Sequence, residues 1–501
     1  MTIVAATVTD LSRVVPLSEQ LTASYLEYAG VLPLECRDGV LRLATWRDSV
    51  DEQVLDDLRV LFDADVEMEQ GAESDVRSAI QRAYARESTA QGVIDAVAPN
   101  EAADVSDSGP IDDLVMMANE APVVKLVNLL LIEALDARAS DIHLEAYASG
   151  LHVRYRVDGV LQQAPSPPAH LSAAVVSRLK IMSELDIAER RLPQDGRIRL
   201  RLQNRPVDVR VSTVPTLHGE SVVLRLLDKN QGRIGLQELG MSDNTLARLK
   251  SAIGKPHGIV LATGPTGSGK TTTLYAAIDH IRTGREKILT VEDPIEYQLG
   301  VPQVPVNEKI GVTFATALRA LLRQDPDVML VGEIRDAETA EIATQAALTG
   351  HLVLSTLHTN DASSALTRLL ELDVAAYLVA STVRAVLAQR LVRMICPRCK
   401  AVADVRPNEL AALFGSTEVG AVYTGHGCVE CRGTGYRGRV GIYEVLTMTD
   451  ELRRAVTERR NSAELRRIMV EDGSPTLLDD GLRLIASGIT TPDEVLRVVS
   501  G

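Results

Sequence analysis

The sequence predicts an α/β protein in which a P-loop (RecA-like) domain follows an α+β domain and a small N-terminal domain. Three observations predict this class. Hydrophobic residues make up 45% of the 501 residues and aromatic residues only 3%, so the cores must be aliphatic, which suits stacked helices and parallel sheets. Short apolar strands alternate with helical patterns from Ile259 to about Arg393. A glycine-rich turn joins the first of these strands to its helix, which is where a P-loop occurs.

The chain is acidic, and its charge is unevenly distributed. The net charge is −15, and residues 1–110 hold 21 acidic and 8 basic residues. An acidic chain lacks the electrostatic footprint of a nucleic-acid binder, which counts against helicases and DNA packaging motors. We therefore expect no nucleic-acid partner. The acidic N-terminal part is consistent both with a merely soluble domain and with a docking surface for a basic partner.

Length and hydropathy bound the domain number and the compartment. At 501 residues the chain exceeds the size at which a single hydrophobic core keeps growing, so we expect three or four domains. No apolar run approaches the ~18 residues that span a bilayer, and the N-terminus has no basic stretch leading into an apolar one. These features predict a cytoplasmic protein.

A small N-terminal domain is predicted at 1–90. Short strands are expected at Val31–Leu34 and Val40–Ala44, and a helical pattern of apolar residues runs from Val54 to Leu61. Residues 91–110 are mostly Ala, Asp, Ser, Pro and Gly with little periodicity. This composition predicts a flexible linker.

A second α+β domain is predicted at 111–227. Its first helix has one apolar face, and strands follow at Ile142–Leu144, Leu151–Val157 and Val207–Val214. Residues 228–235 are rich in turn-forming residues and predict a hinge into the next domain. The apolar face of the helix consists of Val123, Val124, Val127, Leu130, Leu131 and Ala134.

The P-loop core is predicted at 236–395 and contains the strongest motif of the chain, a complete G-x-x-x-x-G-K-[ST] sequence. The apolar strand Ile259–Ala262 precedes the motif, and apolar residues at helical spacing follow it. The glycines allow backbone N–H groups to wrap phosphates at a helix N-terminus. We expect Lys270 to contact the β- and γ-phosphates of ATP and Thr271 to hold Mg²⁺. The predicted nucleotide-binding residues are Gly264, Pro265, Thr266, Gly267, Ser268, Gly269, Lys270, Thr271 and Thr272.

Hydrolysis requires one carboxylate for the metal and another for the attacking water. Candidates follow two apolar strands. The run Val328–Glu333 ends in an acid, as a Walker B segment does, although with Glu where Asp is commoner. The run Ile288–Glu296 carries acids just beyond a strand. His358, at the end of a third strand, is a candidate sensor of the γ-phosphate, although a lone His is more often structural.

Two C-x-x-C pairs define a cysteine module at 396–437. They are separated by 28 residues, and glycines surround the second pair, which is typical of a closed structural zinc site. A redox dithiol pair is the alternative. Cys36 is the fifth cysteine, and we expect it to be buried. A helical subdomain is predicted at 438–501. The four predicted zinc ligands are Cys396, Cys399, Cys428 and Cys431.

Six runs of residues resemble a known family. Four of them are similar to the Walker A, aspartate, Walker B and histidine boxes of the secretion ATPase superfamily, and two are most similar to the type II secretion ATPases within it. The resemblance extends from about Ile111 to the C-terminus. The four boxes are Gly264–Thr273, Val291–Tyr297, Leu322–Asp336 and Thr349–Asn360, and the other two runs are Leu185–Arg197 and Leu387–Arg393.

The resemblance implies a hexameric ATPase whose second domain closes over the nucleotide. It implies that Glu296 is the catalytic carboxylate and that Glu333 supports Mg²⁺. Arg210 and Arg225 match the family's phosphate-reaching arginines, and a surface salt bridge is the competing interpretation for each. Further candidates are Arg319 and Arg323. In the family, the cysteine module is likewise a metal-binding insertion.

The resemblance also implies partners and leaves alternatives open. The family's N-terminal domain docks on a membrane-anchored secretion protein, which would associate the chain peripherally with the inner membrane and its platform. Residues 1–110 match that domain only loosely. Pilus-extension ATPases share the same boxes, whereas the retraction ATPases are shorter and lack the cysteine module. A scaffold that binds ATP without turnover is a further alternative, but it would not need a water-positioning acid such as Glu296. The expected cofactors are ATP, Mg²⁺ and Zn²⁺.

Overall fold

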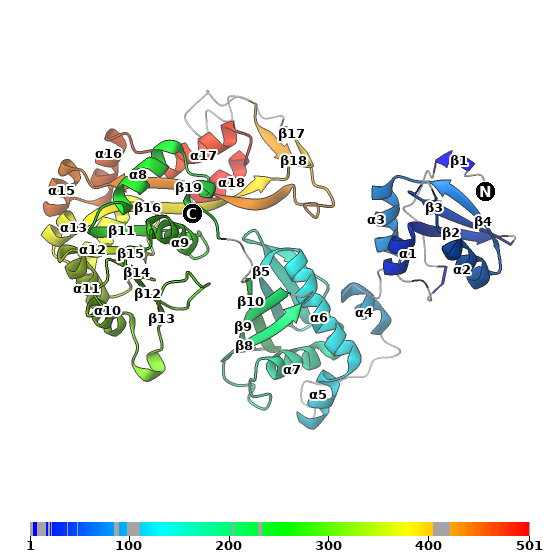
Figure 1. Cartoon of the computed structure of the whole chain (residues 1–501). Helices are drawn as coiled ribbons and strands as arrows, with labels where there is room; N and C mark the ends of the chain where they lie inside the picture. Colours follow the sequence, from blue (N-terminus) through cyan, green and yellow to red (C-terminus); the bar gives the residue numbers. More distant parts are fainter. Residues whose placement is uncertain are drawn as a thin grey trace. The chain divides into compact units, whose positions relative to one another are not determined.

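The computed structural model describes residues 4–7, 17–18, 21, 23–37, 39–47, 49–84, 90–97, 111–202, 205–228, 233–403 and 421–499. The chain divides into two compact units, Met1–Asn230 and Gln231–Gly501 (Figure 1). The boundary between the units falls within the predicted hinge at 228–235, of which residues 229–232 lie outside the described part. Among the described residues, no helix is long and apolar enough to cross a membrane.

In its described residues, the N-terminal domain is a four-stranded sheet with three helices. Its elements are β1 (Val4–Thr7), α1 (Ala23–Ala29), β2 (Val31–Arg37), β3 (Val40–Thr45), α2 (Glu52–Phe62), β4 (Asp65–Gln70) and α3 (Glu73–Tyr84). The strand order is β1-β4-β3-β2, and the predicted strands and helix are confirmed. The prediction that Cys36 is buried is wrong, because it lies in the exposed end of edge strand β2.

A helix occupies the first part of the predicted linker. Helix α4 (Ala90–Val97) packs against the second domain, and the Ala90 N–H donates to the Glu133 carboxylate at 2.7 Å. Ala90 and Val93 are buried at helical spacing in the core of that domain. The prediction of a flexible tether is therefore wrong for residues 91–97. The remainder, 98–110, lies outside the described residues.

The second domain is an antiparallel sheet covered on one face by helices. Its elements are α5 (Ile111–Ala118), α6 (Ala121–Asp136), β5 (Ala139–Tyr147), β6 (Gly150–Val157), β7 (Val160–Gln163), α7 (Ser172–Met182), β8 (Gln194–Leu202), β9 (Arg205–Thr216) and β10 (Gly219–Asp228). The strand order is β7-β6-β5-β10-β9-β8. The predicted apolar face of α6, without Val124 and with Leu126 in addition, shares one core with alternate residues of β5, β9 and β10. Because side chains alternate along a strand, the intervening residues project from the opposite face of the sheet.

The second unit is built on a seven-stranded sheet. Its elements up to the cysteine module are α8 (Asp243–Ile253), β11 (Gly258–Thr263), α9 (Lys270–Ile281), β12 (Ile288–Glu292), β13 (Gln303–Pro305), α10 (Phe314–Leu322), β14 (Val328–Val331), α11 (Ala337–Leu348), β15 (Leu352–Leu357), α12 (Ala362–Glu371), α13 (Ala376–Thr382) and β16 (Val383–Ile395). Strands β11, β12, β14 and β15 are fully buried, as expected for a parallel sheet covered on both faces. Along β11, alternate residues enter two different cores, one on each face.

The C-terminal part contributes a strand as well as helices. It comprises β17 (Lys400–Val402), β18 (Tyr423–Gly425), β19 (Tyr436–Thr447), α15 (Asp450–Thr457), α16 (Ser462–Glu471), α17 (Leu477–Ala486) and α18 (Pro492–Val499). Strand β19 pairs antiparallel with β16 and completes the sheet order β13-β12-β14-β15-β11-β16-β19. The predicted helical subdomain at 438–501 thus begins with most of strand β19, and helices α15 to α18 follow it. The cysteine module is inserted between two neighbouring strands of the seven-stranded sheet.

Candidate active site

The glycine-rich turn connects β11 to α9 as the sequence predicted. Its glycines Gly264, Gly267 and Gly269 have φ values of +144°, +79° and +87°, which L side chains rarely adopt. A Cβ at Gly264 would lie 2.5 Å from the main-chain oxygen of Gln389, so only glycine fits there. The turn therefore presents its backbone at the N-terminus of α9, where N–H groups and the helix dipole favour an anion.

Lys270 is folded back over this turn. Its side chain is buried, and Nζ donates to the carbonyl oxygens of Gly264 (2.7 Å) and Pro265 (3.1 Å). Burial lowers the pKa of Lys270 to about 8, although the nearby Glu333 carboxylate opposes this shift. Ser268 Oγ is also buried, and it makes no hydrogen bond to the part of the chain that the structure describes. Thr271 and Thr272 follow in the first turn of α9, half-buried. These groups fit a phosphate chain with Mg²⁺.

Glu333 and His358 meet beside the turn. Glu333 follows β14 and is nearly buried, and its carboxylate pairs with Arg335 (2.5 Å) and His358 Nε2 (3.2 Å). Strands β14, β15 and β11 are parallel neighbours, so their carboxyl ends bring Glu333, His358 and the glycine-rich turn to one edge of the sheet. The structure thus brings three predicted site segments together.

The acids at the end of β12 and just beyond it separate into two groups. Glu292 is buried and accepts hydrogen bonds from Tyr275, from Thr290 Oγ1 (2.5 Å) and from Gln303 Nε2 (3.0 Å). Burial and this carboxylate raise the pKa of Tyr275 well above its ordinary value. A carboxylate with three donors is committed to the fold, so Glu292 has a structural role. Asp293 and Glu296 are exposed, in contrast, and can approach solvent.

The candidate arginines of the second domain form a row across its sheet. Arg210 on β9 is directly opposite Arg197 on β8 and Arg225 on β10. Arg225 Nε donates to Asp141 at 3.0 Å, and Arg156 lies 3.8 Å from the same carboxylate. The row lies on the sheet face that α6 and α7 do not cover. In the other unit, Arg319 pairs with Glu338 at 2.7 Å and accepts, through its carbonyl, from Arg323 at 3.0 Å.

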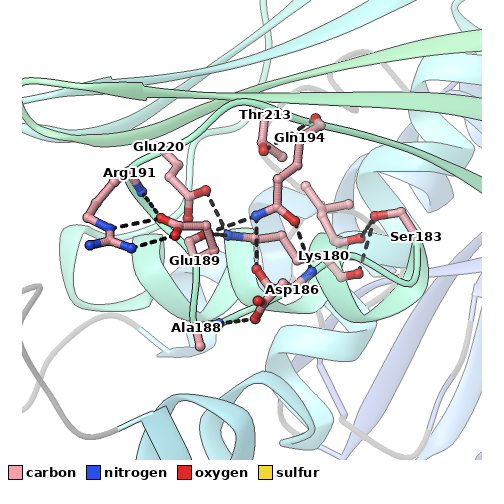
Figure 2. A network of polar contacts seen from close by, with 10 residues as sticks. Lys180, Ser183, Asp186, Ala188, Glu189, Arg191, Gln194, Thr213 and Glu220 are labelled. Carbon is pink, nitrogen blue, oxygen red and sulfur yellow. Dashed lines mark hydrogen bonds and ion pairs between the residues drawn. The ribbon is translucent and has the colours of Figure 1, made fainter. Parts of the chain in front are cut away.

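The run at 185–197 is held by a buried lysine that the sequence did not single out. Figure 2 shows Lys180 of α7 reaching beneath the segment that precedes β8. Its Nζ donates to the Glu189 carbonyl (2.7 Å) and to the Glu220 carboxylate (2.8 Å). The Gln194 side chain also bonds to the main chain of Asp186 and Glu189 (Figure 2). The segment between α7 and β8 is therefore fixed by side chains at both its ends.

The four cysteines of the module converge. Their sulfur atoms all lie within 4.8 Å of one another, and three pairs are separated by 3.6 to 3.8 Å. Four thiolates about 2.3 Å from a tetrahedral zinc ion would be about 3.8 Å apart, so the cluster fits a closed site. The N–H groups of Cys428 and Gly435 point at Cys431 Sγ (3.1 and 3.3 Å). Burial opposes ionisation of this thiol, but the hydrogen bonds lower its pKa to about 6.

Comparison with known proteins places the chain in context. The family model "Type II/IV secretion system protein" matches residues 116–497, and the "MshEN domain" model matches residues 6–90. The chain is 46% identical to type II secretion system protein E of Xanthomonas campestris pv. campestris, over 97% of this chain and 86% of that protein. It is 49% identical to type II secretion system ATPase E of Vibrio cholerae, over 77% of each chain. The pilus retraction motor PilT with bound ADP is similar in structure, with a TM-score of 0.50, 26% identity, and coverage of 74% of this chain and 96% of that one.

Proposed function

The chain belongs to the type II/IV secretion system protein family, and on this premise we propose that it powers type II protein secretion by converting ATP hydrolysis into mechanical work. The observation that carries the proposal is the meeting of Lys270, Glu333 and His358 at one edge of the sheet. A cation, a metal-supporting acid and a candidate γ-phosphate sensor around a P-loop suit phosphoryl transfer to water. The exposed acid Glu296 on a neighbouring loop supplies a group for the attacking water.

Each residue of the site has a distinct role in this proposal. Lys270 leaves its carbonyl partners and binds the β- and γ-phosphates, while N–H groups of residues 266–271 hold the phosphate chain. Thr271 and Glu333 would hold Mg²⁺. When bound, Mg²⁺ supplies positive charge that stabilises the transferring phosphoryl group. Glu296 orients or deprotonates the attacking water, and His358 monitors the γ-phosphate through its contact with Glu333.

The other domains connect the site to the secretion machine. We propose that the second domain closes over the nucleotide about the hinge at 228–235, bringing Arg210 and Arg225 to the phosphates. We further propose that the chain acts as a homohexamer in the cytoplasm. Its N-terminal domain would dock on a membrane-anchored secretion protein, and the ring would act on the inner-membrane platform. The match of residues 6–90 to a recognised domain supports a dedicated docking role for that part.

Secretion by the source bacterium tests the proposal. Deleting the gene should leave the exported proteins in the periplasm, and the wild-type gene should restore them to the medium. A Lys270→Ala gene should fail to do so, because the phosphates lose their cation. Lys255→Ala removes an exposed lysine away from the turn and should restore secretion fully. Normal secretion with loss of surface pili in the deletion strain would instead identify a pilus-extension motor.

We propose that the tetracysteine cluster holds one structural zinc ion. The purified protein should contain one zinc per chain, and Cys399→Ser or Cys431→Ser should lose the metal and unfold the module locally. Elemental analysis and limited proteolysis measure the two effects. Cys36→Ser should retain the metal, because Cys36 belongs to another domain. A folded, metal-free protein with a Cys396–Cys399 disulfide would support the redox alternative.

A further inference from the structure

Arg390 is a buried cation directly beneath the active site. It lies on β16, is 5% exposed, and is in the core of the sheet rather than at its surface. Within the described part of the chain, its guanidinium donates to neutral oxygen atoms: Nη2 donates to the Asn360 carbonyl (2.9 Å) and to Asn360 Oδ1 (3.2 Å), and Nη1 donates to the Gln389 carbonyl (3.2 Å). Burial lowers the pKa of Arg390, and the carboxylates of Asp361 and Glu444 only partly oppose this. Burying a cation whose hydrogen-bond partners are neutral carbonyl groups costs free energy of desolvation that these bonds offset only in part. Stability of the fold alone therefore does not explain an arginine at this position.

The Arg390 guanidinium and the neighbouring Gln389 side chain contact the glycine-rich turn. A Cβ at Gly264 would lie 3.0 Å from Arg390 Nη1, so the guanidinium is packed against the first residue of the turn. The adjacent Gln389 supports the other end: a Cβ at Gly269 would lie 2.7 Å from its Nε2, and Thr273 Oγ1 donates to its Oε1 at 2.7 Å. The pair Gln389–Arg390 therefore contacts the turn at its beginning, at its end and in the first turn of α9.

The Arg390 guanidinium also binds the segment that contains His358. Asn360 is two residues beyond His358, and Arg390 binds both its main-chain and its side-chain oxygen. A second connection lies nearby, because Thr263 Oγ1, at the end of β11, bonds to the main chain of Leu357 and Thr359. His358 in turn contacts Glu333 at 3.2 Å. Arg390 thus lies between the phosphate-binding turn and the group that contacts the proposed metal-supporting carboxylate.

We propose that Arg390 is a positioning residue for ATP hydrolysis, which holds the segment 358–360 in a fixed place relative to the glycine-rich turn. The inference rests on the proposed function, since it assigns a role within that site. The planar guanidinium suits the task because its fork can reach the two oxygens of Asn360 and the Gln389 carbonyl together, whereas the single ammonium of lysine is a point charge. Arg390 acts on catalysis through other residues. Its loss should therefore slow turnover more than it weakens nucleotide binding.

Steady-state kinetics of Arg390→Lys on the full-length protein test this role. We expect kcat to fall by about 10- to 100-fold, because a small displacement of a reacting group has effects of that size. The affinity for a fluorescent ADP analogue should change by less than about threefold. The matched control is Arg393→Lys on the same strand. Arg393 is also largely buried, but it pairs with Glu494 of α18 at 2.6 Å. Its kcat should stay within about twofold of the wild type, since the contacts of its side chain with described residues, Glu494 and Tyr436, lie outside the site.

A second variant keeps the inference testable if Arg390→Lys does not fold. Asn360→Ala removes an exposed side chain and only one of the two Asn360 oxygens that Arg390 binds, so it should fold normally and lower kcat by a smaller factor at unchanged ADP affinity. Its control is Asn244→Ala, an exposed asparagine on α8 that also accepts from an arginine, Arg248. If both genes give folded protein, the combined Arg390→Lys and Asn360→Ala variant should lose less activity than the product of the two single effects.

Several results would contradict the positioning role of Arg390 or the proposed function, and each can be told from the others. An unchanged kcat in either variant, or a loss of ADP affinity as large as the loss of kcat, would overturn the positioning role. An equal loss in the Arg393→Lys control would show that β16 matters only for stability. The wild-type protein measured alongside separates this inference from the proposed function, because a wild type that does not hydrolyse ATP would refute the function itself.

Discussion

Replacing Glu296 by Gln should leave ATP binding nearly intact and reduce hydrolysis by about 10²-fold or more, the effect of losing a general base. Gln keeps the shape of the side chain but cannot accept a proton from the attacking water. Glu296 is exposed beyond the end of β12, whereas Glu292 of the same segment is buried and accepts from three donors. Binding of a fluorescent ADP analogue and the steady-state rate of phosphate release measure the two effects separately.

Two further variants serve as a comparison for Glu296→Gln. Lys270→Ala should abolish both binding and turnover, because it removes the cation of the phosphate site. Glu308→Gln changes an exposed acid on a neighbouring segment and should leave both properties unchanged. A wild-type rate for Glu296→Gln would show that the assignment is wrong. Asp293, the other exposed acid after β12, would then be the next residue to test.

The sequence predicts best those parts of the site that are local in the chain. The strand, glycine-rich turn and helix around Lys270 form one contiguous run, and each has its own pattern of spacing. The ends of β14 and β15 were predicted for the same reason. Strand β19 was not predicted, because it follows the cysteine module whereas its partner β16 precedes that module. Helix α4 was missed because its composition is that of a linker, although Ala90 and Val93 have helical spacing.

The features of the site that the sequence does not predict are contacts between segments far apart in the chain. Arg390 and Arg393 lie on one strand and look alike in the sequence, yet one is packed beneath the glycine-rich turn and the other against α18. Thr273 and Gln389, which hydrogen-bond under the turn, are 116 residues apart. Lys180 meets Glu220 across 40 residues. Charge and periodicity do not indicate such pairs, because only the folded sheet determines which side chains meet.

Replacing Arg210 by Ala should reduce ATP hydrolysis by about 10³- to 10⁵-fold, which corresponds to roughly 4–7 kcal/mol of barrier. This is the range for an arginine that reaches the transferring phosphate. Arg210 lies on the sheet face that α6 and α7 do not cover, opposite Arg197 and Arg225. Arg225 pairs with Asp141. The control Arg201→Ala removes an exposed arginine at the far end of β8 and should retain the wild-type rate.

Mixing two defective chains shows on whose nucleotide Arg210 acts. A hinge at 228–235 would allow the second domain to close over the nucleotide of its own chain, so we predict a same-chain finger. Arg210→Ala and Lys270→Ala chains are combined under conditions that allow rings to exchange subunits. With same-chain fingers every site stays defective, and the activity should not exceed that of the separate variants. With fingers across subunits, some interfaces would pair an intact arginine with an intact P-loop, and activity would return.

Recovery of activity well above that of both separate variants would overturn the same-chain prediction and leave the ATPase assignment standing. A wild-type rate for Arg210→Ala alone would remove the finger assignment, and Arg225 would be tested next.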